Sequence, residues 1–398
     1  MTATDGPAGA GSAAGDGLAA GAGFAAGAGW PELPPLVDQH CHGVLREVPT
    51  DVEEFAGWLS ESGAPPAAGT SHFDSSLGLA VRRWCPPALG LDAYAPPEEY
   101  LAARRALGAV EANRTLLRAA GLGSLLVDDG PLPGASLPTS ELATAAGATA
   151  FHVARLEPLA EAAADLAGRD TDAFLARVAA GIDRAAARSV AFKSVAAYRH
   201  GLDLEPEPPS RAELWTAAEH WLLTRGAGDR LVNPVLLRHL IWSAVATGLP
   251  LQLHTGFGDT DLRLHRADPA LLTDLIRAVA PTGCPLVLLH CYPYHRQAAH
   301  LAAGYPQVYV DLGLTLSHVG GRAPAVLAET LELAPFGKLL FSTDAYGLPE
   351  LYLVGARQFR WALAEALTGP GWPAAEAERA AALIAAGNAR RLYRLPPP

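Results

Sequence analysis

The stretch Leu36-Val37-Asp38-Gln39-His40-Cys41-His42 combines a short, strand-like run with two histidines at its carboxyl end. In an extended strand successive side chains alternate between the two faces, so residues two apart share a face. His40 and His42 therefore point to the same side, as two ligands of one metal ion must. We predict a β-strand here, with a pair of candidate metal ligands at its end.

Seven further short apolar runs follow, and each precedes a segment with a helical pattern. Such runs are typical of strands buried on both faces, as in a parallel sheet. Eight strand–helix units predict an α/β fold, specifically a (β/α)8 TIM barrel. The predicted strands are residues 36–40, 124–128, 150–155, 190–193, 250–254, 286–290, 308–311 and 339–344. Predicted helices include 171–188, 210–224, 268–280, 323–334 and 350–367.

Residues 43–123 separate the first two predicted strands, which is far more chain than one crossover helix needs. We predict that this segment is a helical insertion that caps the barrel mouth. A barrel with insertions can use the whole of residues 31–398 as one domain. Residues 1–30 are rich in Ala and Gly, and we expect a disordered tail.

Charge and composition argue against several classes of function. The chain of 398 residues has a formal net charge of −11, which repels phosphate backbones, so we expect no nucleic-acid partner. It lacks an uninterrupted apolar run of about 18 residues, so we expect no membrane span. Its four cysteines form no C-x-x-C pair, and the first residues do not resemble a secretory signal. We therefore expect a cytoplasmic protein with a small-molecule substrate; a homo-oligomer remains open.

Polar residues stand at the carboxyl ends of five predicted strands. In a barrel these ends face the active-site mouth, so residues distant in sequence converge there. Each residue alone has an ordinary explanation, since an isolated His is often a core residue and a strand-end Asp often caps the next helix. The joint pattern favours a metal site. The candidate ligands are His40, His42, Lys193, His254, His290 and Asp344.

Lysine usage draws attention to Lys193. Only Lys193 and Lys338 are lysines among the 30 basic residues, and arginine cannot replace a primary amine in chemistry. The apolar residues 190–192 precede Lys193, so burial should lower its pKa. Such an amine can pair with a carboxylate such as Glu157, attack a carbonyl, or capture carbon dioxide as a carbamate.

The same residues resemble the amidohydrolase superfamily, in which His-x-His lies on the first strand, Lys on the fourth, His on the fifth and sixth, and Asp on the eighth. Residues 192–199, 254–259, 289–294 and 342–345 look closest to the amidohydrolase domain that is fused to glutamine-synthetase-like domains in some fungal and plant proteins. The resemblance covers roughly residues 33–395, and we expect the stand-alone form of that domain.

The resemblance implies a metal-dependent hydrolase. His40, His42 and Asp344 would hold one divalent cation, while His254 and His290 would hold a second or orient the substrate carbonyl. Asp344 would take a proton from water and deliver it to the leaving group. A carbamate on Lys193 could bridge two cations. Zinc is the expected metal, with manganese or iron as alternatives and one or two ions per site.

Residues beside these strand ends are candidates for substrate binding. Arg155 could bind a substrate carboxylate through two N–H groups, or it could pair with Glu157. The two tyrosines after His290 could line the pocket or pack beneath the loop, and Asp128 is expected to make a turn. The predicted substrate-binding residues are Arg155, Asp259, Tyr292, Tyr294 and His72.

Three functions remain open at this point. The first is hydrolysis of an amide or related C–N bond in a small polar metabolite, and the fusion partners of relatives suggest a glutamyl amide. The second is a metal-dependent decarboxylase or isomerase, because the same barrel and ligands serve those reactions elsewhere. The third is a non-catalytic binding protein. It is disfavoured because every expected ligand is present.

We predict that deletion of residues 1–29 leaves the melting temperature and the activity unchanged, because that segment has few side chains able to bury apolar surface. Calorimetry of the full-length and truncated proteins tests this. A melting temperature lower by several degrees would show instead that the segment packs on the barrel.

Overall fold

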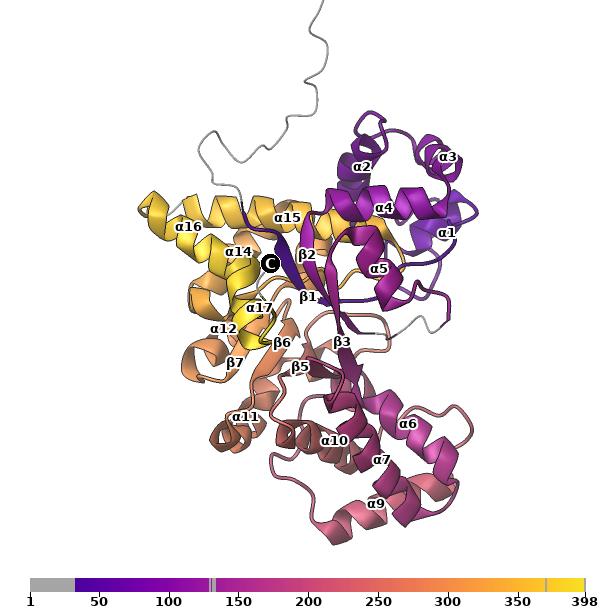
Figure 1. Ribbon diagram of the computed structural model, residues 1–398, viewed down its shortest axis with the longest axis vertical. Coiled ribbons are helices and arrows are strands. Elements are labelled where there is room, and N and C mark those ends of the chain that lie inside the picture. The colour runs from indigo at the N-terminus through magenta and orange to yellow at the C-terminus, as the bar shows by residue number, and fades with distance from the viewer. Residues whose placement is uncertain (1–32, 129, 131–133, 369–370, 397–398) are drawn as a thin grey trace, which may run out of the picture.

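The computed structural model describes residues 33–128, 130, 134–368 and 371–396 (Figure 1). The predicted tail, residues 1–30, lies outside the described residues, as does Asp129. None of the helices in the described part of the chain has the length and apolar character that a membrane span requires.

Eight parallel strands pair in chain order, which confirms the predicted (β/α)8 barrel. The strands are β1 (Leu36–Cys41), β2 (Leu122–Asp128), β3 (Thr149–Arg155), β4 (Ala191–Ser194), β5 (Leu251–Thr255), β6 (Leu286–His290), β7 (Val308–Asp311) and β8 (Leu339–Leu340).

The last strand is shorter than the sequence predicted. β8 ends at Leu340, whereas the predicted strand continued to Asp344. Asp344 has a φ of 51°, which is incompatible with an extended strand. Backbone hydrogen bonds nevertheless continue along β1, from Gln39 N to Phe341 O (3.1 Å) and from Asp344 N to His40 O (3.0 Å). These bonds join the first strand to the segment after the last one.

Most helices lie outside the barrel and between successive strands (Figure 1). Their starts follow local rules: Ser210 and Glu213 form a capping box, and Asn233 caps a helix whose first residue is Pro234. These helices are α5 (Thr139–Ala146), α6 (Leu156–Ala167), α7 (Thr171–Ala186), α8 (Ala196–Arg199), α9 (Arg211–Thr224), α10 (Pro234–Ala246), α11 (Thr273–Val279), α12 (His295–Gly304), α13 (Gly313–Val319), α14 (Ala323–Leu331), α15 (Pro349–Thr368), α16 (Ala374–Ala382) and α17 (Asn388–Leu392).

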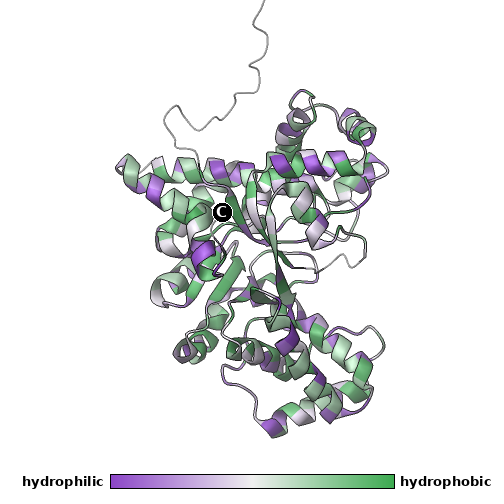
Figure 2. Cartoon of the chain, viewed as in Figure 1, coloured by the Kyte–Doolittle hydropathy of each residue, from purple (hydrophilic) through white to green (hydrophobic). Residues whose placement is uncertain are grey.

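The hydrophobic core lies between the strands and the inner faces of these helices. Figure 2 shows apolar residues along the strands, while the outer helices alternate between apolar and polar faces. Every residue of β1, β4, β5 and β6 is buried, as expected for parallel strands covered on both sides.

Four helices occupy the long segment between β1 and β2, and we call this segment, residues 43–121, the cap. They are α1 (Val52–Gly57), α2 (Ser76–Ala88), α3 (Pro97–Leu107) and α4 (Ala109–Ala119). α2 and α4 pack against α15 of the barrel (Figure 1).

A buried ion pair anchors the cap to the barrel. Arg104 Nε of α3 lies 2.8 Å from Glu350 Oε1 of α15, and both side chains are at most 1% exposed. The Tyr100 hydroxyl also donates to Glu350 Oε1, at 2.7 Å. Each of these buried charges is stabilised by the other, so the loss of one leaves the other buried without a partner.

We predict that Arg104→Met lowers the free energy of unfolding by roughly 3–5 kcal/mol, because it leaves the Glu350 carboxylate buried without its counter-charge. Urea denaturation followed by circular dichroism measures the change. Arg114→Met is the matched control, since Arg114 forms an exposed pair with Glu111 on the neighbouring helix and should have little effect. Equal midpoints for the two variants would contradict the anchoring role of Arg104.

Candidate metal centre and substrate cavity

The two histidines at the end of β1 are held in a defined tautomer. His40 Nδ1 lies 2.9 Å from Gln252 Oε1, and His42 Nδ1 lies 2.9 Å from the backbone oxygen of Asp128. The Gln252 amide nitrogen donates to the Gln39 backbone oxygen at 2.7 Å, which fixes the amide orientation. Both partners can therefore only accept, so each Nδ1 carries the proton and each Nε2 keeps a free lone pair.

Both free nitrogens face the same carboxylate oxygen. Asp344 Oδ1 lies 3.1 Å from His40 Nε2 and 3.3 Å from His42 Nε2. Burial and the nearby Lys193 lower the pKa of His40 to about 4, so its imidazole is neutral at neutral pH. The three lone pairs converge on one point, where a positive charge is needed to offset their repulsion, and Lys193 Nζ lies only 3.0 Å from one of them, His40 Nε2. This donor set fits a divalent metal ion.

His254 and His290 complete the cluster. Their ring centroids are 4.6 Å apart, and His290 Nε2 lies 3.6 Å from Asp344 Oδ2. Among the described residues, no hydrogen-bond partner reaches His254 Nε2 or either nitrogen of His290. Buried nitrogens are normally paired, so unpaired ones here indicate space for a ligand or metal. The five predicted residues therefore converge on one point at the barrel mouth.

Lys193 faces this cluster and not a carboxylate. Its Nζ lies 3.0 Å from His40 Nε2, and its side chain is buried. Burial lowers the pKa of Lys193 to about 8, although the charges of Asp344 and Asp128 oppose the shift. The alternative partner Glu157 instead accepts hydrogen bonds from Ser194 Oγ (2.7 Å) and Val195 N (2.9 Å). The sequence-based alternative of a Lys193–Glu157 pair is thus wrong.

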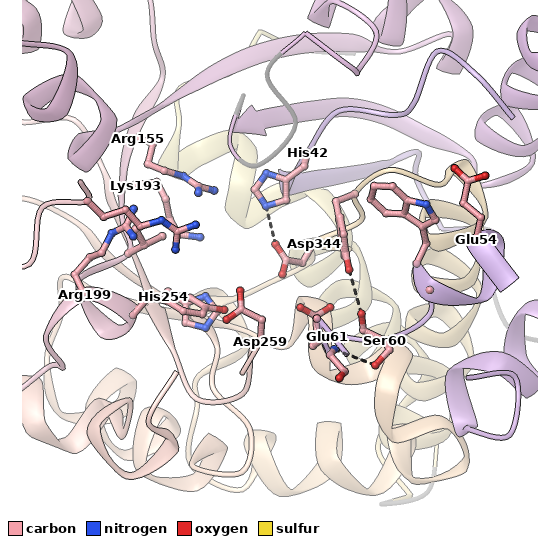
Figure 3. Close-up of a pocket in the computed structure, with 18 residues that line it drawn as sticks. His42, Glu54, Ser60, Glu61, Arg155, Lys193, Arg199, His254, Asp259 and Asp344 are labelled. Atoms are coloured by element: carbon pink, nitrogen blue, oxygen red, sulfur yellow. Dashed lines mark hydrogen bonds and ion pairs between the residues drawn. The ribbon is translucent and has the colours of Figure 1, made fainter. Parts of the chain in front are cut away.

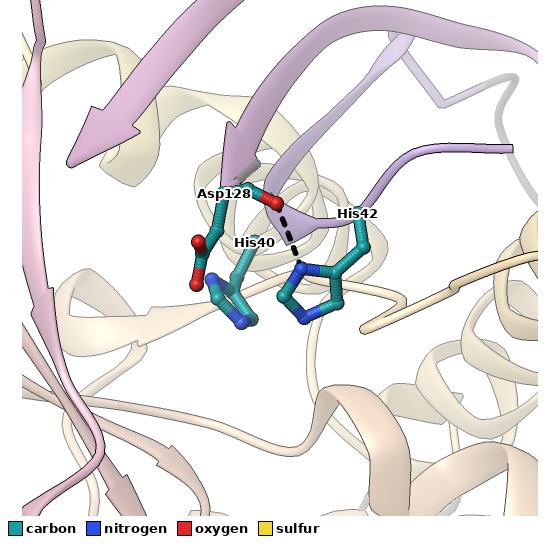
Figure 4. A group of neighbouring side chains, drawn as sticks. All are labelled: His40, His42 and Asp128. Carbon is teal, nitrogen blue, oxygen red and sulfur yellow. Dashed lines mark hydrogen bonds between the residues drawn. The ribbon is translucent and has the colours of Figure 1, made fainter. Parts of the chain in front are cut away.

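A second carboxylate beside the histidines is already paired. Figure 4 shows Asp128 next to His40 and His42. Asp128 Oδ2 accepts from Arg155 Nε (3.0 Å) and Nη2 (2.7 Å), and Oδ1 accepts from Gly130 N, which makes the predicted turn. Burial alone would raise the pKa of Asp128, but the charge of Arg155 lowers it below its usual value. Arg155 therefore pairs with Asp128, and the proposed Arg155–Glu157 pair is wrong.

A cavity of about 560 Å³, the main cavity, opens above the histidine cluster (Figure 3). His42, Lys193, His254 and Asp344 form its floor, and two predicted substrate-binding residues, Arg155 and Asp259, also line it. The cap supplies another wall. The cap residues are Glu54, Gly57, Trp58, Ser60, Glu61, Ser62 and Gly63.

A side cavity of about 340 Å³ adjoins the first and shares Glu61 and Asp259 with it. His72, predicted to bind substrate, lines only this side cavity, together with His318. The predicted histidine of the cap therefore lies beside the main cavity and not in it.

Tyr292 and Tyr294 line neither cavity, so their predicted place in the pocket is wrong. The chain turns sharply after β6, with a positive φ at both His290 and Cys291. The Tyr292 ring then stacks on the His295 ring at 5.7 Å, and Tyr294 immediately precedes α12. This matches the alternative of packing beneath the loop.

Sequence reasoning missed most of the residues that line the main cavity, including Tyr198, Arg199 and Glu61. Tyr198 and Arg199 lie on α8, directly after the Lys193 strand, and that position could have identified them. The absence of a side chain at Gly258 leaves room for Tyr198. A Cβ at position 258 would lie 2.0 Å from Tyr198 Oη and 3.0 Å from His254 Nε2. Glu61 carried no sequence signal, because nothing in its local pattern links the cap to the barrel mouth.

Comparison with known proteins identifies the family. The Amidohydrolase family model matches residues 37–395. Protein fluG of Emericella nidulans is 39% identical over 223 residues, 52% of this chain but only 26% of fluG. This match thus spans about a quarter of the curated relative's length.

Solved structures agree with this match. A candidate metal-dependent hydrolase from Lactobacillus casei superposes with a TM-score of 0.77 at 29% identity, covering 91% of this chain and 95% of that one. A uronate isomerase from Bacillus halodurans shares the fold, with a TM-score of 0.62 at 13% identity and coverage of 91% and 94%. With the family model matching nearly the whole described chain, this protein belongs to the amidohydrolase family.

Proposed function

We propose that this protein is a metal-dependent hydrolase that cleaves an amide or related C–N bond in a small polar metabolite. One observation carries the proposal: the free nitrogens of His40 and His42 converge on Asp344 Oδ1, at 3.1 and 3.3 Å, on the floor of the main cavity. The similar structure from Lactobacillus casei adds support, since that protein is described as a candidate metal-dependent hydrolase.

His40, His42 and Asp344 are the residues that would hold the cation, and zinc is the expected metal, with manganese or iron as alternatives. When bound, a divalent cation would lower the pKa of a water molecule to around 7 and polarise the substrate carbonyl. His254 and His290 lie beside this point and would orient the carbonyl or hold a second ion.

Asp344 is the proposed proton carrier. Its Oδ1 faces the two histidines, which leaves Oδ2 to accept a proton from the attacking water. Water oxygen then bonds to the acyl carbon, the C–N bond breaks, and the amine leaves with the proton that Asp344 returns to it. The backbone turn at Asp344, with its φ of 51°, places the carboxylate at the cavity floor.

Lys193 has two proposed states. As a neutral amine it can take up carbon dioxide and become a carbamate, which would supply an anion between His40 and the His254–His290 pair. As an ammonium it would remain a hydrogen-bond donor to His40 Nε2. The distance of 3.0 Å between Lys193 Nζ and that nitrogen supports a role for Lys193 beside the candidate ligands.

A metal-dependent isomerase is the second candidate, because the fold is shared with uronate isomerases and three arginines line the main cavity together with Lys193. At 13% identity this likeness concerns the fold alone. An isomerase conserves the mass of its substrate, whereas a hydrolase adds water. Mass spectrometry of the products therefore separates the two candidates.

We predict that Asp344→Asn lowers kcat by about 10²–10⁴-fold, because an amide cannot take a proton from water. Thermal stability should change little, since the amide has nearly the same shape. The measurements are turnover and metal content of the purified variant. Asp268→Asn serves as control, because Asp268 caps a short helix and Asn caps equally well. Wild-type turnover in Asp344→Asn would remove Asp344 from the mechanism.

We predict that Lys193→Ala loses metal and activity together, and that a small carboxylic acid added with metal restores part of both. Lys193→Arg should fail outright, because a guanidinium cannot become a carbamate. Metal analysis and turnover are measured side by side. Lys338→Arg is the matched control, since Lys338 only donates to the backbone oxygens of Ala302 and Tyr305. If Lys193→Arg keeps metal and activity, the carbamate is excluded.

A further inference from the structure

The two walls of the main cavity differ in chemistry, with basic side chains on one and an acidic side chain on the other. Figure 3 shows Arg155, Lys193 and Arg199 gathered on one side, with Glu61 on the other and Asp344 between them. The basic side chains come from β3, β4 and α8 of the barrel, and Glu61 comes from the cap. A substrate that reaches across the cavity meets both charges.

Among the arginines that line the main cavity, Arg199 has N–H donors that remain available to a ligand. Arg155 already gives two N–H groups to Asp128, and Arg230 is 64% exposed and pairs with Asp261. The Arg199 side chain is only 11% exposed, and its nearest carboxylate oxygen, on Glu161, is 3.7 Å away. Among the described residues, its Nε has no hydrogen-bond partner.

The partner of Arg199 is itself occupied. Glu161 Oε1 accepts a hydrogen bond from Leu231 N at 2.7 Å, which ties that carboxylate to the backbone. The guanidinium of Arg199 therefore faces the cavity with donors available, and a carboxylate is the group that best matches its planar arrangement of N–H donors.

Glu61 is the corresponding acidic group. Its side chain is 17% exposed, and its nearest basic atom, His318 Nε2, is 4.0 Å away, beyond hydrogen-bond distance. Burial, together with the charges of Asp344 and Asp259, raises the pKa of Glu61 to about 8. A cationic group of the substrate would favour the ionised Glu61 carboxylate, because it would offset both the burial and the repulsion.

Aromatic rings border the same end of the cavity. Trp58 and Tyr346 both line it, with ring centroids 5.6 Å apart, and the Tyr346 hydroxyl donates to the Ser60 backbone oxygen at 3.3 Å. Aromatic faces attract ammonium groups through their quadrupoles. The end of the cavity near Glu61 thus combines a carboxylate with aromatic rings, as a site for an organic cation does.

We propose that the substrate carries both a carboxylate and an ammonium group, with Arg199 binding the carboxylate and Glu61 binding the ammonium, so that the scissile amide lies over Asp344. The proposal rests on the hydrolase function and names its substrate class, an amide of an amino acid that keeps its zwitterion. It excludes both purely anionic and purely cationic amides as preferred substrates.

Four chromogenic amides with the same leaving group test this. γ-L-Glutamyl p-nitroanilide carries both charges, glutaryl p-nitroanilide lacks the ammonium, 4-aminobutyryl p-nitroanilide lacks the carboxylate, and butyryl p-nitroanilide lacks both. The value of kcat/KM should be highest for the first and fall by about 10- to 100-fold with each charge removed, the usual effect of losing a charged hydrogen-bond partner. Equal values for all four would overturn the proposal while leaving the hydrolase function in place.

Variants of Arg199 and Glu61 test which residue binds which charged group of the substrate. Arg199→Met should slow only the two amides that carry a carboxylate, and Glu61→Gln only the two that carry an ammonium. Arg199→Lys, which keeps the charge, should retain part of the preference if the first variant folds poorly. Arg263→Met is the control, because Arg263 is exposed and lies outside the main cavity. Unchanged selectivity in both folded variants would contradict the assignment.

Binding separates this proposal from the hydrolase function. Calorimetric titration of the metal-loaded protein uses L-glutamate, glutarate and 4-aminobutyrate as probes, with metal content verified beforehand. L-Glutamate should bind at least about tenfold more tightly than either singly charged probe. If that holds while no anilide is cleaved, the charge assignment stands and the hydrolase function fails. If no probe is preferred, the charge assignment is overturned, whether or not an anilide is cleaved.

Discussion

The arrangement of the site depends on the seam where β1 meets the segment after β8. Asp344 N donates to His40 O, and the buried Asp38 carboxylate accepts from Thr343 N (2.9 Å) and Thr343 Oγ1 (2.6 Å). Burial raises the pKa of Asp38 to about 8, and the bonds from Thr343 oppose that shift. This seam fixes residues from opposite ends of the chain in register. It therefore sets the short distance between the His40 imidazole and the Asp344 carboxylate.

A buried polar layer beneath the seam holds the ligands from behind. Gln252 accepts from His40 Nδ1 and donates to Gln39, while the Tyr393 hydroxyl of the C-terminal segment donates to Gln39 Oε1 at 2.5 Å. Asp311 accepts from Ser342 Oγ at 2.7 Å and from His290 N at 2.7 Å. A fully paired network of this kind holds its members in one orientation, so the direction of His40 Nε2 is set before any ligand binds.

The sequence predicted the barrel and the position of the ligand cluster because the apolar runs that mark the strands end in the polar residues that form the cluster. Buried parallel strands require continuous apolar runs, and the barrel geometry brings their carboxyl ends together, so His254 and Asp344 could be placed without a structure. Side-chain pairs between different strands or helices could not be predicted in this way, because no local sequence pattern identifies the partner. Arg155 pairs with Asp128 and not with its near neighbour Glu157, because β2 and β3 are adjacent in space.

The barrel and the cap contribute different groups to the site: the barrel carries the candidate metal ligands, and the cap carries part of the cavity wall. The candidate ligands lie at strand ends or, for Asp344, in the segment after β8, and the polar layer below holds them. Glu61 and Trp58 lie in the cap, and no described residue of the cap belongs to the ligand cluster. The Arg104–Glu350 pair attaches the cap to α15. Substitutions in the cap loop can therefore alter which substrate is held without moving the groups proposed to activate water. The same arrangement at the barrel mouth is compatible with different substrates for this reason, and the proposed substrate-binding groups lie in the cap and in α8.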